Sequence, residues 1–524
     1  MFPLIYLVDF LAILFFFAIL RTIRDRYQRR TTGLVPYPPG PPPLPVIGNL
    51  FDIPKEFSWL TYTELSKKYG NILFFRVFGQ VIIVLNSPKP AKDLLEKRAD
   101  IYSDRSVIPF YEMADFQFSL AFKRYGEPWR LGRRLLDRGL RPGAAASYRP
   151  VQQARARALL LRLLTSPHEL EAHIELFQGE LILAMAYGYE VQGRDDSMID
   201  VPRRLNEIGI ATALPGALLV NDLPFLRHIP EWLPWLSYQP LARLGRDLTR
   251  VAINEPIRFV KESMLNGTAR PSLALENFQH AEKLKGQQRE KVDKTIVEAL
   301  GSLYTAGVDT TVSAMLSFFL AVVLRPDLQK RAQDEIDAVT GRERLPTFED
   351  RTKLPFVDAV CKEVLRWQPV TPLGEFNILS QARNSDTRVH DLQVCLMRQE
   401  DDIYEGYFIP KGAVGNLHDP EMYPDPEAFK PERFLNPDGS LRDDPTLLAA
   451  FGFGKRVCPA KHFVDATCLS SSLPFSPLST SRKGRALMAD PSSIPILALS
   501  LGICVYPHSR GERKGNWTGL KKES

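Results

Sequence analysis

The chain has 524 residues, 44% hydrophobic and 24% charged, and these ordinary values exclude a disordered or fibrous protein. The net charge of +6 is small and forms no basic stripe interleaved with aromatic residues, which argues against nucleic acid as a partner. The five cysteines are odd in number and lack metal-finger or paired redox spacing, which indicates a reduced chain facing the cytosol. No repeat or linker divides the chain beyond its proline-rich segment, so we expect one large domain.

The amino-terminal segment predicts a membrane anchor. Residues Phe2 to Leu20 are almost all apolar, and a helix of that length spans a hydrocarbon core. Asp9 interrupts the run, at a cost that its apolar neighbours offset. Arginines follow the run instead of preceding it, which disfavours a secretory signal and a buried core helix. By the positive-inside rule, the same arginines predict that the rest of the chain lies in the cytosol. We expect an anchor over residues 1–21 and a basic, proline-rich hinge over residues 22–50.

Strand and helix signals follow one another along the rest of the chain. Ile72 to Phe78 and Val81 to Leu85 are rich in β-formers and flank a turn with glycine, which predicts a hairpin. Apolar residues recur at helical spacing from Tyr148 to Leu164, from Leu170 to Tyr187 and from Val292 to Leu324. We therefore expect a mainly α protein with a small β-rich subdomain.

The last of these segments is interpreted as a central helix of the core. Its apolar part, Val312 to Leu324, is too short to span a bilayer, and Pro326 ends it. The charged residues from Glu282 to Lys291 are expected to form a surface connection before it. Leu214 to Pro240 mixes Pro, Trp, Phe and Leu, which suits either a packed loop or a loop that dips into a membrane surface. We favour the packed loop.

The strongest chemical signal is the stretch Phe451-Gly-Phe-Gly454-Lys-Arg456-Val-Cys458. Glycines let the backbone approach a planar cofactor, and backbone N–H groups can tune the charge of a thiolate held against iron. A buried structural cysteine beside a turn is the plainer interpretation of Cys458 taken alone. The surrounding pattern favours an iron ligand.

This stretch resembles the haem-binding loop of the cytochrome P450 family, Phe-x-x-Gly-x-Arg-x-Cys-x-Gly, with Ala460 in place of the last glycine. Glu363-Val-Leu-Arg366 resembles the Glu-x-x-Arg helix of that family. Pro431-Glu-Arg433-Phe434 resembles the segment whose arginine completes a buried ion network with that pair. Alone, Glu-x-x-Arg is a common surface salt bridge, but this ordered set ahead of Cys458 is specific.

Two further motifs are similar to those of the family. Ala306-Gly-Val-Asp309-Thr310-Thr311 lies in the long apolar helix, where this run is locally unfavourable and indicates a functional kink. The resemblance implies that Thr310 helps to hold dioxygen and that Asp309 connects it to a proton supply. Trp129 and Arg133 match the Trp-x-x-x-Arg helix, which with Arg456 would serve the haem propionates. Without the resemblance they would be a core tryptophan and a solvated arginine.

The resemblance, most like fungal membrane-bound monooxygenases, implies a single haem-thiolate domain over residues 51–467. Its cofactor would be haem b, with Cys458 as the axial ligand and with Phe451 and Gly454 beside the ring. We expect insertion of one oxygen atom of O2 into a lipophilic small molecule, in secondary metabolism or xenobiotic oxidation. The location implied is the endoplasmic reticulum membrane, with a single pass and a cytosolic catalytic domain.

Electrons for this reaction are expected to come from another protein. No glycine-rich dinucleotide fingerprint follows a strand, so the chain carries no flavin or nicotinamide module. The resemblance implies that NADPH–cytochrome P450 reductase docks on a basic face near Cys458.

Two regions depart from the family pattern. After Gly374, residues 375–398 are polar and irregular, and we hypothesise that they are a retained intron. Residues 401–412 return to the pattern, but the apolar strand expected after Gly412 has almost vanished. From Cys468 onward the expected helix gives way to Ser, Pro and Leu, and we hypothesise that residues 468–524 are translated out of frame. A transcript that confirms this frame would refute that hypothesis.

Two other functions compete with a monooxygenase. These departures favour a non-catalytic membrane-anchored haem protein or an inactive isoform. A haem-thiolate isomerase or dehydratase needs no reductase, but the presence of Asp309 and Thr310 argues for oxygen activation.

Overall fold

The computed structural model describes the chain in nine ranges: residues 35–54, 58–105, 107–213, 217–233, 237–341, 344–371, 402–409, 413–414 and 423–472. The predicted anchor over residues 1–21 lies outside these ranges. So do the hypothesised intron over residues 375–398 and the tail beyond residue 472.

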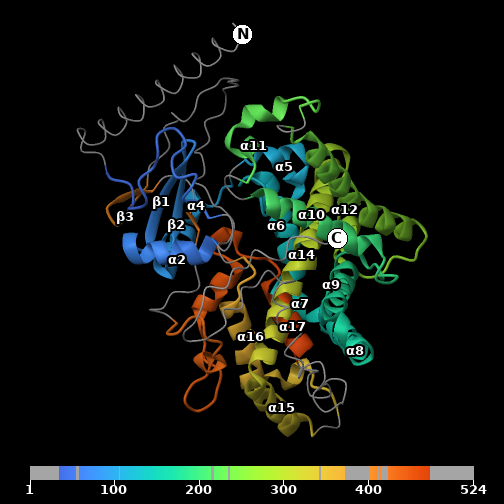
Figure 1. Cartoon of the computed structure of the whole chain (residues 1–524). Coiled ribbons are helices and arrows are strands. Elements are labelled where there is room, and N and C mark those ends of the chain that lie inside the picture. The colour runs from blue at the N-terminus through green and yellow to red at the C-terminus, as the bar shows by residue number, and fades with distance from the viewer. Residues whose placement is uncertain are drawn as a thin grey trace.

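The described residues are mainly helical, as the sequence predicted, with two small sheets (Figure 1). The helices are α2 (Ser58–Tyr69), α3 (Pro88–Lys92), α4 (Ala99–Tyr102), α5 (Pro109–Met113), α6 (Glu127–Leu140), α7 (Pro142–Ala145), α8 (Arg149–Thr165), α9 (Leu170–Tyr187), α10 (Ser197–Ala213), α11 (Leu219–Asp222), α12 (Gln239–Leu265), α13 (Leu273–Ala281), α14 (Gly286–Leu324), α15 (Pro326–Thr340), α16 (Pro355–Trp367) and α17 (Lys461–Ser472). The strands are β1 (Ile72–Val77), β2 (Gln80–Leu85), β3 (Asp402–Tyr404), β4 (Tyr407–Ile409) and β5 (Ala413–Val414).

The predicted hairpin is confirmed as β1 and β2. The two strands pair antiparallel, with Phe74 opposite Ile83, and Gly79 has the positive φ of 89° that this tight turn requires. The second strand begins at Gln80, so the turn lies at Phe78 and Gly79, a little earlier than predicted. Strand β5 pairs parallel with β2, so a very short strand does follow Gly412.

The proline-rich segment packs on this sheet. Pro39 accepts a hydrogen bond from the Phe74 amide at 2.9 Å, and Gly48 forms a bridge with Val77. A Cβ atom on Gly40 would lie 2.0 Å from the Phe74 carbonyl oxygen, so only glycine allows this close approach. Residues 35–50 therefore lie against the domain.

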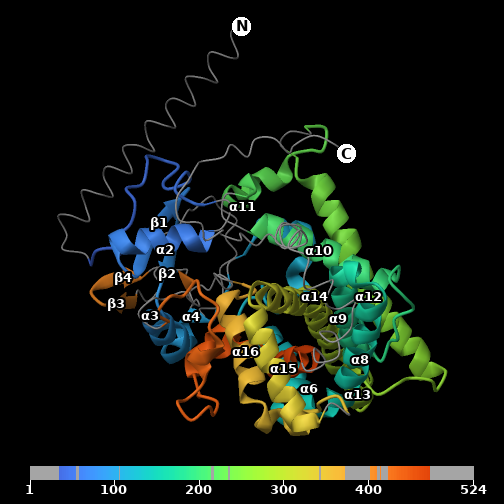
Figure 2. The same cartoon turned by 60° about the horizontal axis from the view of Figure 1, so that its bottom comes forward.

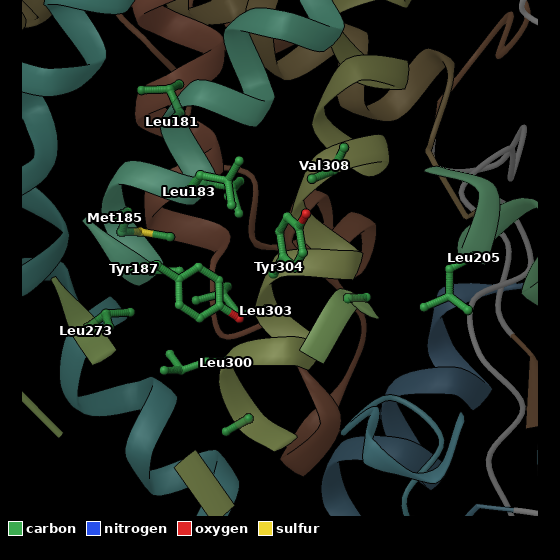
Figure 3. Packing of buried hydrophobic residues seen from close by; sticks show 14 of the residues in the cluster. Leu181, Leu183, Met185, Tyr187, Leu205, Leu273, Leu300, Leu303, Tyr304 and Val308 are labelled. Atoms are coloured by element: carbon green, nitrogen blue, oxygen red, sulfur yellow. The ribbon is translucent and has the colours of Figure 1, made fainter. Parts of the chain in front are cut away.

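Helix α14 is the central helix of the core. It packs against α9, α6, α10, α12, α13 and α16. Figure 3 shows the apolar contact between α9 and α14, with Leu183 and Tyr187 on one side and Leu303, Tyr304 and Val308 on the other. In the described part of the chain, α14 alone is long and apolar enough to cross a membrane, but 61% of its apolar window is buried inside the protein. It is thus the core helix that the sequence predicted.

Helix α14 starts earlier than the sequence predicted, at Gly286 instead of Val292. Residues 286–291, expected to be a connection, form its first turns. Gln, Arg, Glu and Lys are good helix formers, and Arg289 pairs with Asp293 one turn later at 2.8 Å. The predicted end holds, since α14 stops at Leu324 and Pro326 opens α15. The helix is continuous through residues 306–311.

The long helices and the strands occupy different sides of the molecule. Figures 1 and 2 show β1, β2 and α2 on one side and α8, α9 and α12 on the other, with α14 between them. Helix α17 continues through Cys468 to Ser472, where Leu469 is fully buried. The first residues of the atypical tail are therefore still part of the packed helix.

Candidate functional site

The Cys458 loop is a series of tight turns leading into α17. A 3-10 turn over Pro445–Phe451 ends at Gly452, whose φ is 84°, and the Cys458 amide donates to the Phe451 carbonyl at 2.7 Å. The Ala460 amide donates to the sulfur of Cys458. Burial raises the pKa of the Cys458 thiol, while the Ala460 amide and the charge of Arg133 act to lower it. The loop thus holds a half-buried cysteine whose sulfur already has a donor for its ionised form.

Gly454 lets this loop approach the segment before α4. Its φ is 55°, and a Cβ atom there would lie 2.1 Å from the Leu95 carbonyl oxygen. No other residue satisfies both conditions, because a side chain would clash with fixed backbone. The role of Gly454 beside the ring remains a prediction. The close approach to Leu95 is by itself a reason why position 454 requires glycine.

Arg456 is held by backbone carbonyls under the ring of Trp129. Its guanidinium donates to Ser103, Leu120 and Lys123 at 2.8, 3.0 and 2.8 Å, and it lies 4.4 Å from the centre of the Trp129 ring. Burial and, to a smaller extent, the positive charge of Arg105 lower the pKa of Arg456 to about 9. A half-buried cation is thus kept beside another arginine, and Asp104 is a carboxylate that favours its charge.

Trp129 and Arg133 both belong to α6 and lie beside this arginine. The Trp129 indole donates to the Leu120 carbonyl at 3.2 Å, and Arg133 donates to Asp137 at 2.8 Å and to the carbonyl of Val457. The spacing of four residues puts both on one face, as predicted. The structure therefore brings Trp129, Arg133 and Arg456 together around the Cys458 loop.

Thr310 lies on an exposed strip in the middle of a buried helix. Ala306 and Thr310, one turn apart on α14, are exposed, whereas residues 299–305 before them and Thr311 and Val312 after them are buried. The Thr310 hydroxyl donates to the Ala306 carbonyl at 2.8 Å. The two side chains of this strip are therefore accessible from outside the packed core.

Asp309 points toward α10. Its carboxylate accepts a hydrogen bond of 2.6 Å from the amide of Asn206. Burial raises the pKa of Asp309, against the lowering effects of Asn206 and of the Arg203 charge. A carboxyl with a raised pKa is suited to carry a proton nearer to neutral pH than an exposed aspartate.

Glu363, Arg366 and Arg433 come together as a buried cluster. Arg366 and Glu363 are fully buried and form two hydrogen bonds of 2.7 and 2.8 Å, and Arg433 approaches Glu363 at 3.5 Å. The amide of Lys430 also donates to Glu363 at 2.7 Å. This pairing ties α16 to the turn at Pro431–Phe434.

Several residues that act on these motifs were not predicted from the sequence. Arg105 is buried and acts on Arg456, Asn206 binds Asp309, and Gln178 donates to the Gly307 carbonyl at 2.8 Å. None has a local signal in the sequence, because each contact joins residues more than a hundred positions apart in the chain. Only packing of α9 and α10 on α14 could have identified Gln178 and Asn206.

Comparison with known proteins gives the family. The family model for cytochrome P450 matches residues 38–464. The chain is 38% identical over 495 residues to cytochrome P450 monooxygenase 208 of Postia placenta, covering 92% of this chain and 90% of that one. This chain belongs to the cytochrome P450 family.

Other fungal P450 proteins are similar along most of their length. Cytochrome P450 monooxygenase claR of Ampulloclitocybe clavipes is 38% identical over 439 residues, which are 82% of this chain and 77% of that one. Cytochrome P450 monooxygenase COX2 of Coprinopsis cinerea is 34% identical over 450 residues, which are 83% and 81% of the two chains. The chain is thus an enzyme of the cytochrome P450 monooxygenases, whose family uses haem with a cysteine thiolate on the iron.

The residues of this P450 fit a haem group. Ala306 and Thr310 are exposed on α14, and the sulfur of the half-buried Cys458 already has an amide donor. Arg105 and Arg133 both depress the pKa of Arg456, and the two carboxylates of a haem would relieve that repulsion. These residues therefore match a haem in the charge that they carry and in the exposed surface of α14.

Proposed function

We propose that this P450 is a haem-thiolate monooxygenase that inserts one oxygen atom of O2 into a lipophilic small molecule. The observation that carries the proposal is the gathering of Trp129, Arg133 and Arg456 around the Cys458 loop. Cys458 would be the axial ligand, with Phe451 and Gly454 beside the ring, and the three donors would hold the propionates. Bound there, haem b would supply the oxygen-activating chemistry. Secondary metabolism or xenobiotic oxidation is the proposed setting.

Asp309 and Thr310 are proposed to act as the acid and alcohol of this site. Asp309 is half-buried, has a raised pKa, and is therefore able to hold a proton and release it toward the neighbouring exposed strip. The Thr310 hydroxyl lies in that strip and can donate or accept a hydrogen bond. The buried cluster of Glu363, Arg366 and Arg433 is proposed to keep α16 in place beneath the site.

A basic face of α6 supports docking of NADPH–cytochrome P450 reductase. Arg130, Arg134, Arg138 and Arg141 are exposed and recur at helical spacing. Over the described ranges none of the four forms an ion pair with a neighbouring acid. Arg133 of the same helix donates to Val457 beside Cys458, so an acidic partner bound here would lie close to the proposed iron ligand.

Exposed apolar side chains support a position on the membrane. Phe51, Phe225 and Trp232 are 79%, 60% and 74% exposed. Residues 35–54 and α11 lie at the same end of the domain in Figure 1, where Gln80 donates to the Asn221 carbonyl at 3.4 Å. We propose an anchor over residues 1–21, a hinge over 22–50, a cytosolic domain over 51–467, and attachment to the endoplasmic reticulum.

Carbon monoxide binding to the reduced protein tests the proposal. The purified full-length chain should give the red-shifted absorption band of a thiolate-ligated haem, and Cys458→Ser should lose that band. Cys361→Ala is the matched control, since Cys361 is another cysteine of the described domain and lies buried on α16. A wild-type protein without the band would refute the proposal and favour the inactive isoform. A band that persists in Cys458→Ser would refute the assigned ligand.

A further inference from the structure

Asn206 joins α10 to the middle of α14 through one amide group. Its Nδ2 atom donates to the Thr305 carbonyl at 2.7 Å and to the Asp309 carboxylate at 2.6 Å. An amide nitrogen has two hydrogen atoms, so both donors are used and the orientation of the group is fixed. One side chain on α10 thus binds two positions, one turn apart, on the helix that carries the proposed acid.

The charged groups around Asp309 lie on α10 and α9. From α10, Arg203 attracts the carboxylate and Glu207 repels it, while Glu175 on α9 is a further like charge. Arg203 is itself engaged by Asp200 and Glu207 at 2.6 and 2.7 Å. Among the described residues, Asn206 is the group that hydrogen-bonds directly to the Asp309 side chain.

We propose that Asn206 is a positioning residue for Asp309, holding its carboxylate on the α10 side of α14 and making its protonation depend on how α10 is seated. The proposal rests on the proposed function, in which Asp309 carries protons. A donor favours the ionised carboxylate, so Asn206 opposes the effect of burial and keeps Asp309 able to release its proton. In each cycle Asp309 would give up one proton and recover one from solvent.

Helix α10 packs on α12, α14 and α9, and several hydrogen bonds fix its position along α14. The Tyr304 hydroxyl donates to the Met198 carbonyl, and the Tyr111 hydroxyl donates to the Gly209 carbonyl at 2.8 Å. These two bonds hold the beginning and the end of α10, and Asn206 lies between them. A movement of α10 away from α14 would separate Asn206 from Asp309.

The test measures the protonation of Asp309 directly. Infrared spectra of the full-length protein, labelled with ¹³C-aspartate, would be titrated with pH, and subtraction of Asp309→Asn identifies the carboxyl band of Asp309. Asn206→Ala and Asn206→Asp remove the donor, and Asn206→Gln keeps an amide. Asn221→Ala is the matched control, because Asn221 donates to the Thr212 carbonyl of α10 at 2.8 Å without touching Asp309.

The expected result is an upward shift of the Asp309 midpoint by roughly one pH unit in Asn206→Ala, the size expected for one lost hydrogen bond to a charged group. Asn206→Asp should shift it further, Asn206→Gln should recover part of the shift, and Asn221→Ala should leave it unchanged. An unchanged midpoint in both donor-free variants would overturn the proposal, and so would an equal shift in Asn221→Ala. The reduced carbon monoxide spectrum of the same samples tests the haem-thiolate function separately.

Discussion

Asp309, Glu363 and Cys458 are three acidic groups that the fold removes from water to different degrees, Glu363 fully and the other two in part. Glu363 has two arginines and a backbone amide, so its charge is fully compensated. Asp309 has a neutral amide and a distant arginine, and its pKa stays raised. Cys458 has an amide donor and Arg133, and burial still raises its pKa. The charge of Glu363, the structural acid, is therefore the best compensated. The charges of Asp309 and Cys458, which are proposed for chemistry, are compensated only in part.

Incomplete compensation of Asp309 predicts a pH-dependent stability. The folded protein binds the Asp309 proton more tightly than the unfolded chain does, so this group costs stability as pH rises through its folded pKa. Asp309→Asn, which cannot ionise, should equal the wild type in acid and exceed it at neutral pH, by about 1.4 kcal/mol per unit of raised pKa. Urea unfolding at several pH values measures this. A variant that is less stable at neutral pH would contradict it.

At the scale of elements, the contact of α9 with α14 depends on small residues and buried amides. A Cβ atom on Gly307 would lie 2.7 Å from Cδ1 of Ile182 on α9, and Gln178 of the same helix donates to the Gly307 carbonyl. The glycine that the sequence analysis connected with a kink therefore also allows two helices to approach.

Gly307→Ala should therefore destabilise the protein, by about 1–3 kcal/mol, because the added methyl group overpacks the interface. Gly209→Ala on α10 is the matched control, since its Cβ atom would lie 3.5 Å from Phe116, an ordinary contact. That change should be neutral or stabilising, because alanine favours helix over glycine. Ile182→Val should recover part of the loss at Gly307. Equal effects of the two glycine replacements, measured by denaturant unfolding, would exclude overpacking.

At the scale of the whole molecule, the membrane and the reductase are proposed to bind different elements. The exposed apolar residue Phe51 follows Asn49, which bonds to β1, and Phe225 and Trp232 follow Asn221, which contacts Gln80. The exposed arginines lie on α6, next to the Cys458 loop. Helix α14 lies between the sheet side and the outer helices and packs on both α6 and α10. The electron donor can thus approach the loop without competing with the apolar surface.

Charge reversal on α6 should weaken the binding of the reductase. Arg134→Glu with Arg138→Glu is expected to raise the reductase concentration needed for half-maximal haem reduction roughly tenfold at low salt. The difference should shrink as salt screens the charges. Arg250→Glu on α12 is the matched control, an exposed arginine on another helix. If Arg250→Glu has the same effect, net charge rather than this face controls docking.

The sequence by itself determined the hairpin, the bounds of α9, the end of α14 and the order of the motifs that show the family. These signals are local, because periodicity, glycine and proline act on neighbouring residues. Tertiary structure alone decided that Asn206 binds Asp309, that Gln178 binds Gly307, and that the charge of Arg105 acts on Arg456. Such contacts join residues far apart in the chain, and no pattern along the sequence encodes which helix faces meet. They depend on how α9 and α10 pack on α14.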